Sequence, residues 1–225
     1  MSPPSDDARA RARRDLDGLV VSMELTLISV IQGTALYFLV NTSFADVAGL
    51  HYRVWPYLFS GLLIIFLFWT RALLHTLTVI GWPLEFGHNF IYIAATLLEA
   101  VMFNYQANPL AWHAVSIPFW SLLWFLFVFD LKMLRRGHAE NPGPAFSRLL
   151  GVLEKEQRIN IWFVMPAAVL YYIVATVLLY RDPASEYLAW GLGIAQCVSL
   201  VGYLAYVLKF YERLVPMILE TRAEA

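Results

Sequence analysis

Charged side chains are scarce in this sequence. Asp, Glu, Lys and Arg together make up only 15% of its 225 residues, whereas 60% of the residues are apolar. Soluble domains usually carry about 25% charged residues, because water has to solvate their surface. The shortage excludes an ordinary soluble fold and predicts that much of the protein surface contacts lipid.

Cysteine is almost absent as well. Cys197 is the only cysteine, and it lies inside an apolar run. A single cysteine excludes an intrachain disulfide and any multi-cysteine zinc or iron–sulfur site. The sequence also lacks a glycine-rich phosphate-binding loop and a basic, aromatic-interleaved surface, so we expect no nucleic-acid partner. The first apolar run is too long for the hydrophobic region of a cleaved signal peptide.

Six apolar stretches are long enough to cross a bilayer. A hydrocarbon core of about 30 Å requires about 20 helical residues, since backbone groups in lipid must be hydrogen-bonded internally. We therefore predict an all-α, polytopic membrane bundle of about six transmembrane helices within residues 16–210. The predicted spans are Leu19–Val40, Val54–Thr78, His88–Tyr105, Ala111–Leu131, Ile161–Tyr180 and Tyr187–Leu208.

Lysine and arginine gather on one side of the predicted bundle. They precede the first span, populate the loop of residues 132–160 and follow the last span, whereas the opposite loops hold only Arg53 and Arg181. The positive-inside rule therefore places both termini in the cytoplasm, as an even number of spans requires. We expect residues 1–15 to be disordered and residues 211–225 to form a cytoplasmic tail.

A short amphipathic helix is predicted inside the charged loop. Phe146, Leu149, Leu150 and Leu153 follow the spacing of one helical face, and most charged residues of the segment fall on other faces. Such a pattern is typical of a helix that lies on a membrane surface. We expect this helix on the inner face of the membrane.

Polar residues form one stripe along the third predicted span. They recur at intervals of three or four residues, which places them on one side of a helix. The stripe comprises Glu85, Asn89, Tyr92, Thr96, Glu99 and Phe103, and the expected opposite face comprises Ile91, Ala94, Leu98 and Met102. Ionisable residues in a span usually face the bundle interior or a water-filled path. The stripe thus indicates a cation or proton path, or a buried face whose polar groups satisfy one another.

The first two spans carry further polar residues. Arg71 and His75 lie one turn apart in the second span, and a buried Arg71 requires a carboxylate partner, for which Glu24 or Glu85 is expected. Gln32 belongs to a stripe of small and polar residues in the first span, which is typical of helix packing in lipid. We expect Asp130 to be solvated at the inner end of the fourth span. The outer-loop histidines His51 and His113 are expected to be solvated too.

These patterns favour a small membrane transport protein, a channel or carrier for an inorganic cation or protons, rather than an enzyme. No catalytic residue is predicted, and the sequence requires no cofactor. The chain is small for a complete pathway, so we expect a homo-oligomer. The predicted pathway residues are Glu24, Gln32, Arg71, His75, Glu85, Asn89, Thr96 and Glu99.

Two other functions remain open at this point. His75, Glu85 and His88 are candidate metal ligands, and a membrane-embedded metal- or haem-binding oxidoreductase or assembly factor would use them. Bundle metal sites normally need two Glu-x-x-His pairs, whereas this sequence has one, Glu85 with His88. The third hypothesis is a non-catalytic scaffold or complex subunit whose charged loop docks a partner protein.

Overall fold

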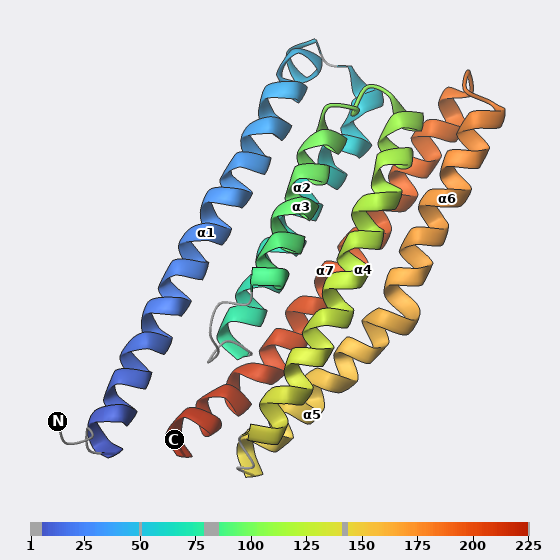
Figure 1. The fold of residues 1–225 in the computed structure, drawn as a ribbon. Coiled ribbons are helices and arrows are strands. Elements are labelled where there is room, and N and C mark those ends of the chain that lie inside the picture. The colour runs from blue at the N-terminus through green and yellow to red at the C-terminus, as the bar shows by residue number, and fades with distance from the viewer. Residues whose placement is uncertain (1–5, 50, 79–85, 141–143, 225) are drawn as a thin grey trace.

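A computed structural model describes residues 6–49, 51–78, 86–140 and 144–224 (Figure 1). The described residues are almost all helical and include no strand, which confirms the all-α prediction. The elements are α1 (Asp6–Ala48), η1 (Tyr52–Val54), α2 (Trp55–Thr78), α3 (Phe86–Phe103), α4 (Pro109–Glu140), α5 (Pro144–Ile159), η2 (Asn160–Val164), α6 (Met165–Arg181) and α7 (Glu186–Glu224).

Within the described residues, five helical stretches are long and apolar enough to cross a membrane. They are Leu25–Ala48, Tyr52–Leu74, Pro109–Arg135, Pro144–Arg181 and Glu186–Thr221. A shorter apolar stretch, Phe90–Phe103, belongs to α3. By length and composition, the chain is a multi-pass membrane protein.

Helix also covers two segments that lie outside the predicted spans. α1 begins at Asp6, inside the 1–15 segment for which disorder is predicted, while residues 1–5 lie outside the described chain. The predicted loop of residues 132–160 consists largely of the end of α4 and the whole of α5. Helix therefore continues beyond the apolar runs on this side of the molecule.

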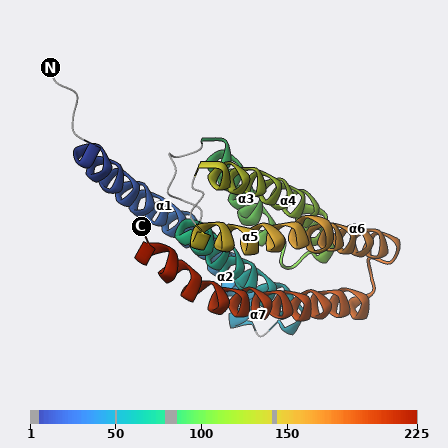
Figure 2. The ribbon, with the colours of Figure 1, turned by 90° about the horizontal axis from the view of Figure 1, so that it is seen from below.

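The helices form an elongated bundle in which neighbours in space are not always neighbours in sequence. α1 contacts α2 and α3, α3 contacts α4, α4 contacts α6, and α2 contacts α7. The Tyr171 hydroxyl of α6 donates to the Leu192 carbonyl of α7 at 2.6 Å and closes the ring of helices. The N-terminal half of α1 leans away from the other helices (Figures 1 and 2).

Glycine permits close helix approach at the contact between α7 and the first turn of α2. A Cβ atom placed on Gly193 of α7 would lie 2.7 Å from the Cβ of Pro56 and 3.3 Å from Cζ of Tyr57, both on α2. Small residues let helix backbones approach each other in lipid, where close packing rather than the hydrophobic effect drives association. The contact between α2 and α7 therefore depends on the absence of a side chain at Gly193.

α5, η2 and α6 follow one another without a break and form one bent helical segment. Asn160–Val164 is a π-helix, and Pro166 follows it in the first turn of α6. Proline cannot donate a backbone hydrogen bond, and π-turns accommodate such interruptions, often at functional sites. The apolar face of α5 packs on the bundle, with Leu149 and Leu153 in one cluster with Leu74 of α2 and Leu214 of α7.

Candidate functional site

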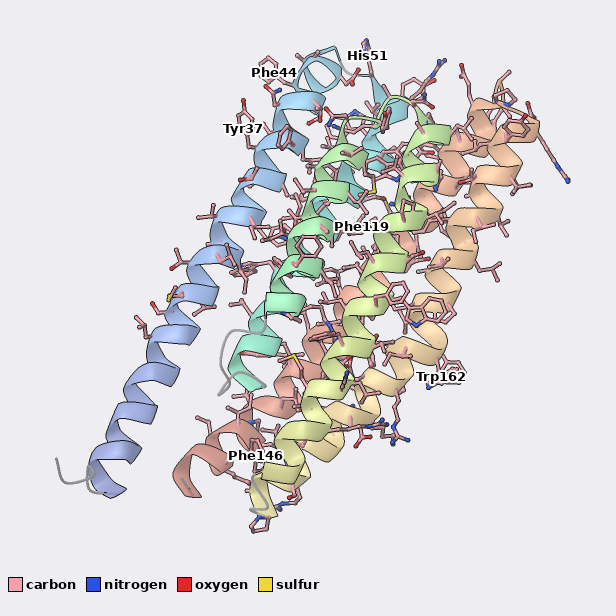
Figure 3. The ribbon with its side chains drawn as sticks, in the orientation of Figure 1. Tyr37, Phe44, His51, Phe119, Phe146 and Trp162 are labelled. Atoms are coloured by element: carbon pink, nitrogen blue, oxygen red, sulfur yellow. The ribbon has the colours of Figure 1, made fainter. Side chains whose placement is uncertain are left out.

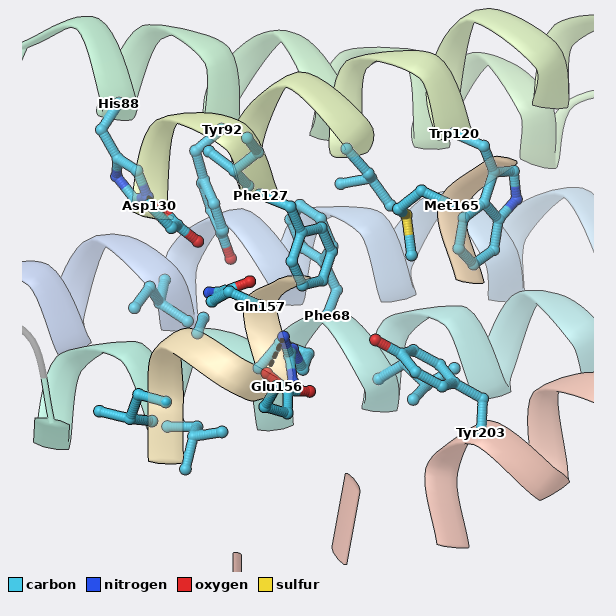
Figure 4. Close-up of a pocket in the computed structure, with 18 of the residues that line it drawn as sticks. Phe68, His88, Tyr92, Trp120, Phe127, Asp130, Glu156, Gln157, Met165 and Tyr203 are labelled. Atoms are coloured by element: carbon cyan, nitrogen blue, oxygen red, sulfur yellow. Dashed lines mark hydrogen bonds and ion pairs between the residues drawn. The ribbon is translucent and has the colours of Figure 1, made fainter. Parts of the chain in front are cut away.

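A cavity of about 100 Å³ lies among the helices at the end where α5 packs on the bundle. A cavity needs about 10–15 Å³ of such volume to hold one water molecule, so this cavity has room for several. Most of its wall is apolar and aromatic. Its polar lining comprises Arg71, His88, Tyr92, Asp130, Glu156, Gln157 and Tyr203. In Figure 4, His88 and Asp130 lie at one end of the cavity, and Trp120 and Met165 lie at the other.

Arg71 forms a two-point ion pair in this cavity with Glu156 of α5. Nη1 donates to Oε1 at 2.6 Å, and Nη2 donates to Oε2 at 3.2 Å. The guanidinium also lies over the Phe127 ring, 4.7 Å from its centroid. Among the described residues, the carboxylate that pairs with Arg71 is Glu156, which sequence analysis did not name. The Glu24 side chain and Glu85 lie outside the described part of the structure.

The same carboxylate connects α5 to the π-helix and to α7. Asn160 is fully buried, and its Nδ2 donates to Oε1 of Glu156 at 2.5 Å. The Tyr203 hydroxyl of α7 donates to Oδ1 of Asn160 at 2.8 Å. The four polar groups from Arg71 to Tyr203 thus form one continuous network across α2, α5, η2 and α7. Satisfied polar networks of this kind fix the arrangement of the helices that carry them.

His88 and Asp130 form a second polar pair in the cavity lining. His88 Nε2 lies 3.2 Å from Oδ1 of Asp130, and both side chains are largely buried. The prediction that Asp130 is solvated is wrong. It assumed that the fourth span ends at Leu131, whereas α4 continues to Glu140 and keeps Asp130 inside the bundle.

The polar stripe of α3 faces the interior, as its spacing predicts. Tyr92, Thr96, Glu99 and Phe103 are all buried. Phe90, Ile93, Leu97 and Val101 form the exposed face. Met102, which was expected on the face opposite the stripe, is instead fully buried and accepts a hydrogen bond from the Ser116 hydroxyl at 3.0 Å. The Asn89 side chain lies outside the described part of the structure.

Glu99 is a fully buried carboxylate that has no counter-charge among the described side chains. Neither of its oxygens makes a hydrogen bond of normal geometry. Gln32, which is 5% exposed, is its polar neighbour across the contact between α1 and α3. Gln32 Nε2 also donates to the Tyr92 hydroxyl at 3.4 Å, and Tyr92 lines the cavity. Polar groups therefore lead from the cavity to Glu99.

Polar contacts continue past Glu99 toward the opposite end of α3. Gln106 Nε2 donates to the Thr42 hydroxyl at 2.5 Å, and this hydroxyl lies 3.1 Å from the Phe103 carbonyl. Thr96 has a local bond, from its hydroxyl to the Tyr92 carbonyl at 3.1 Å. The predicted residues Gln32, Thr96 and Glu99 thus belong to one buried polar strip between α1 and α3.

His113 lies in a separate aromatic pocket. It is fully buried, and its ring is 5.6–5.9 Å from the ring centroids of Tyr57, Tyr171 and Tyr172. Neither ring nitrogen has a hydrogen-bond partner among the described groups. The expectation that His113 is solvated is wrong, because its position near the start of α4 faces α2 and α6.

The candidate metal ligands are not brought together in the described part of the chain. Glu85 and the His75 side chain lie outside it, and His88 is engaged with Asp130. No group of three or more His, Cys, Asp or Glu side chains among the described residues is placed to hold a metal ion. The metal hypothesis therefore gains no geometric support from the residues that are described.

Sequence reasoning missed the contribution of α5 to the site. Leu149, Leu153, Glu156 and Asn160 are spaced by four, three and four residues, so the carboxylate and the amide continue the apolar face of the amphipathic helix. A carboxylate on the buried face of such a helix was the available signal. The partner of Glu156 could not be identified, because helical spacing does not show which helices meet.

No protein-family model, no curated protein and no solved structure matches this chain. The function therefore has to be argued from the geometry and chemistry of the site.

Proposed function

We propose that this chain is a small membrane transport protein that carries protons or an inorganic cation along α1, α2 and α3. Glu99 carries the proposal, because it is a fully buried acid that has no counter-charge among the described residues and only the Gln32 amide beside it. Intramembrane ionisable residues are costly and are usually retained for ion or proton pathways. A carboxylate that serves only structure is expected to be paired, as Glu156 is with Arg71.

The proposed path begins in the cavity and continues along the contact between α1 and α3. The cavity provides room for water and holds two carboxylates, Asp130 and Glu156, each beside a basic group. Tyr92 and Gln32 then lead to Glu99, and Thr42 with Gln106 continues the polar strip. Acceptor oxygens of carboxylates, amides and hydroxyls are the groups that receive a proton or a hard cation.

The membrane topology is part of the proposal. We infer that α3 is a sixth, short span and that both termini and α5 lie on the cytoplasmic side. The excess of lysine and arginine at that end supports this orientation. In a Cys197→Ser background, Lys155→Cys should react with an impermeant maleimide only from the cytoplasmic side, and Asp182→Cys only from the other. The reverse labelling pattern, or labelling of both positions from one side, would refute the topology.

We also propose a homo-oligomer with α1 at the interface between subunits. Met23, Val30, Tyr37 and Phe44 are exposed at seven-residue intervals, which is the repeat of helices that pack along a seam. Figure 3 shows Tyr37 and Phe44 pointing away from the bundle. Val40→Cys in the Cys197→Ser background should form disulfide-linked dimers in liposomes, whereas Val198→Cys on α7 should not. Equal cross-linking of both would indicate random collision.

Ion flux through purified protein in sealed liposomes tests the function. Protons and single inorganic cations are tested one at a time against empty liposomes, and we expect flux for at least one of them. Glu99→Gln should reduce that flux at least tenfold, whereas Glu212→Gln, an exposed carboxylate of α7, should leave it unchanged. The absence of flux for every ion, across pH and applied potential, would refute the proposal.

A further inference from the structure

Among the described side chains, the surroundings of Glu99 contain several buried acceptors but only one donor group, the Gln32 amide. Oε1 and Oε2 of Glu99 and Oε1 of Gln32 are all buried without a hydrogen-bond partner. The amide nitrogen of Gln32 is directed to the Tyr92 hydroxyl at 3.4 Å. Among the described side chains, the Gln32 amide is the group that can donate to the carboxyl, and no Lys, Arg or His does so. An ionised Glu99 therefore has no counter-charge among these side chains and too few donors for its two oxygens and the Gln32 oxygen.

A single proton removes the buried charge and supplies one further donor. An ionised carboxylate only accepts hydrogen bonds, whereas a protonated carboxyl has one O–H donor. We propose that Glu99 and Gln32 form a proton-binding site, and that the proton is the ion taken up at Glu99. The inference rests on the proposed transport function and specifies its substrate. Uptake forms one O–H bond on Glu99 and release breaks it, so no other reactant is needed.

Gln32 suits both states of the acid. Rotation of its side-chain amide exchanges the nitrogen donor and the oxygen acceptor, which are similar in shape. The N–H faces an ionised carboxylate, and the oxygen accepts from a protonated one. Tyr92 links this amide to the cavity, because its hydroxyl bonds Gln32 and its side chain lines the cavity wall. The cavity is thus the side from which the proton arrives.

The number of oxygen ligands beside Glu99 does not favour a metal cation there. Calcium takes about six to eight oxygen ligands and magnesium takes about six, whereas three unpartnered oxygens come from Glu99 and Gln32. A divalent ion would also exceed the charge of one carboxylate. Cation filters that strip water use rings of free backbone carbonyls. α1 and α3 are unbroken helices around Gln32 and Glu99, so their backbone carbonyls are already engaged. A proton needs only one oxygen.

Infrared difference spectroscopy of the protein in lipid tests the site directly. The wild-type spectrum minus that of Glu99→Gln should contain the carbonyl band of one neutral carboxyl, which shifts to lower frequency in D₂O. Gln32→Leu should keep the band and move it to higher frequency, because the hydrogen bond from the acid to the amide is lost. Glu212→Gln should leave the band unchanged. The band shift in Gln32→Leu keeps the test decisive if Glu99→Gln folds poorly.

The outcomes separate the inference from the transport function. A neutral carboxyl band that depends on Glu99 and responds to Gln32→Leu supports the proton site, whatever the flux assay shows. If the band is absent at neutral pH and at pH 5, the inference is overturned. Sodium or potassium flux that requires Glu99 without any proton flux would also overturn it, while leaving the proposed transport function intact. Absence of all flux refutes transport alone.

Discussion

Arg71 of α2 and Glu156 of α5 meet as a two-point ion pair, with N–O distances of 2.6 and 3.2 Å. The two residues are 85 positions apart in the sequence. The pair attaches the bent segment α5–η2–α6 to a spanning helix at the wall of the cavity. Because the carboxylate also binds Asn160, one side chain determines where three structural elements meet.

Breaking this pair should destabilise the protein strongly. Glu156→Gln removes the hydrogen-bonded counter-charge of the largely buried Arg71 guanidinium, and the loss of one partner of a buried pair typically costs about 3–5 kcal/mol. Denaturant unfolding in micelles measures the effect. Glu154→Gln is the matched control in the same helix, because Glu154 pairs with Arg158 at the surface and such a pair contributes about 0.3–0.5 kcal/mol. Equal losses for the two variants would contradict the assigned role of Glu156.

Replacing both partners should separate stability from transport. In Arg71→Met with Glu156→Met, no charge is left unpaired, and such exchanges are often neutral or stabilising by about 1–4 kcal/mol. We therefore expect the double variant to unfold at a higher denaturant concentration than Glu156→Gln. Its ion flux in liposomes should nevertheless fall, because the cavity loses two of its charged groups. A double variant that is stable and keeps the wild-type ion flux would show that the pair is purely structural.

The helical period predicted the parts of the site that lie on a single helix. The spacing of Tyr92, Thr96 and Glu99 indicated one buried face of α3, and the structure confirms that this face is buried. The period cannot reveal which helices pack together, so it did not identify Glu156 as a partner of Arg71. Hydropathy also gives poor helix ends, because a helix does not stop where apolar residues stop. The solvation expected for Asp130 failed for that reason.

His113 shows a different limit of sequence reasoning. A histidine close to a predicted loop is usually solvated, and only three-dimensional packing places three tyrosine rings around it. These tyrosines come from α2 and α6, which are distant from His113 in sequence. The buried environment of His113 is therefore a property of the whole bundle rather than of the local segment.

Adding a methyl group to Gly193 should loosen the contact between α2 and α7. Gly193→Ala would place a Cβ atom 2.7 Å from the Pro56 ring, which cannot rotate away. We expect a loss of about 1–3 kcal/mol from overpacking, which outweighs the gain in helix propensity. Gly202→Ala on the same helix is the control, since no atom lies within 4 Å of its added Cβ. That variant should gain up to about 1 kcal/mol. Two variants that both gain stability would show that the helices are not in close contact at Gly193.

Replacing His113 with an apolar residue should leave stability unchanged or increase it. Neither ring nitrogen has a partner in the aromatic pocket, and an unsatisfied buried polar group costs about 1–3 kcal/mol. His113→Leu removes that cost and has a similar volume, so we expect a gain of up to about 2 kcal/mol. The control is His51→Leu, because His51 is exposed and should change stability by less than about 0.5 kcal/mol. Denaturant unfolding compares both variants with the wild type. A clear loss for His113→Leu would mean that a bound water or ion satisfies the imidazole, and it would make the tyrosine pocket a second polar site of the bundle.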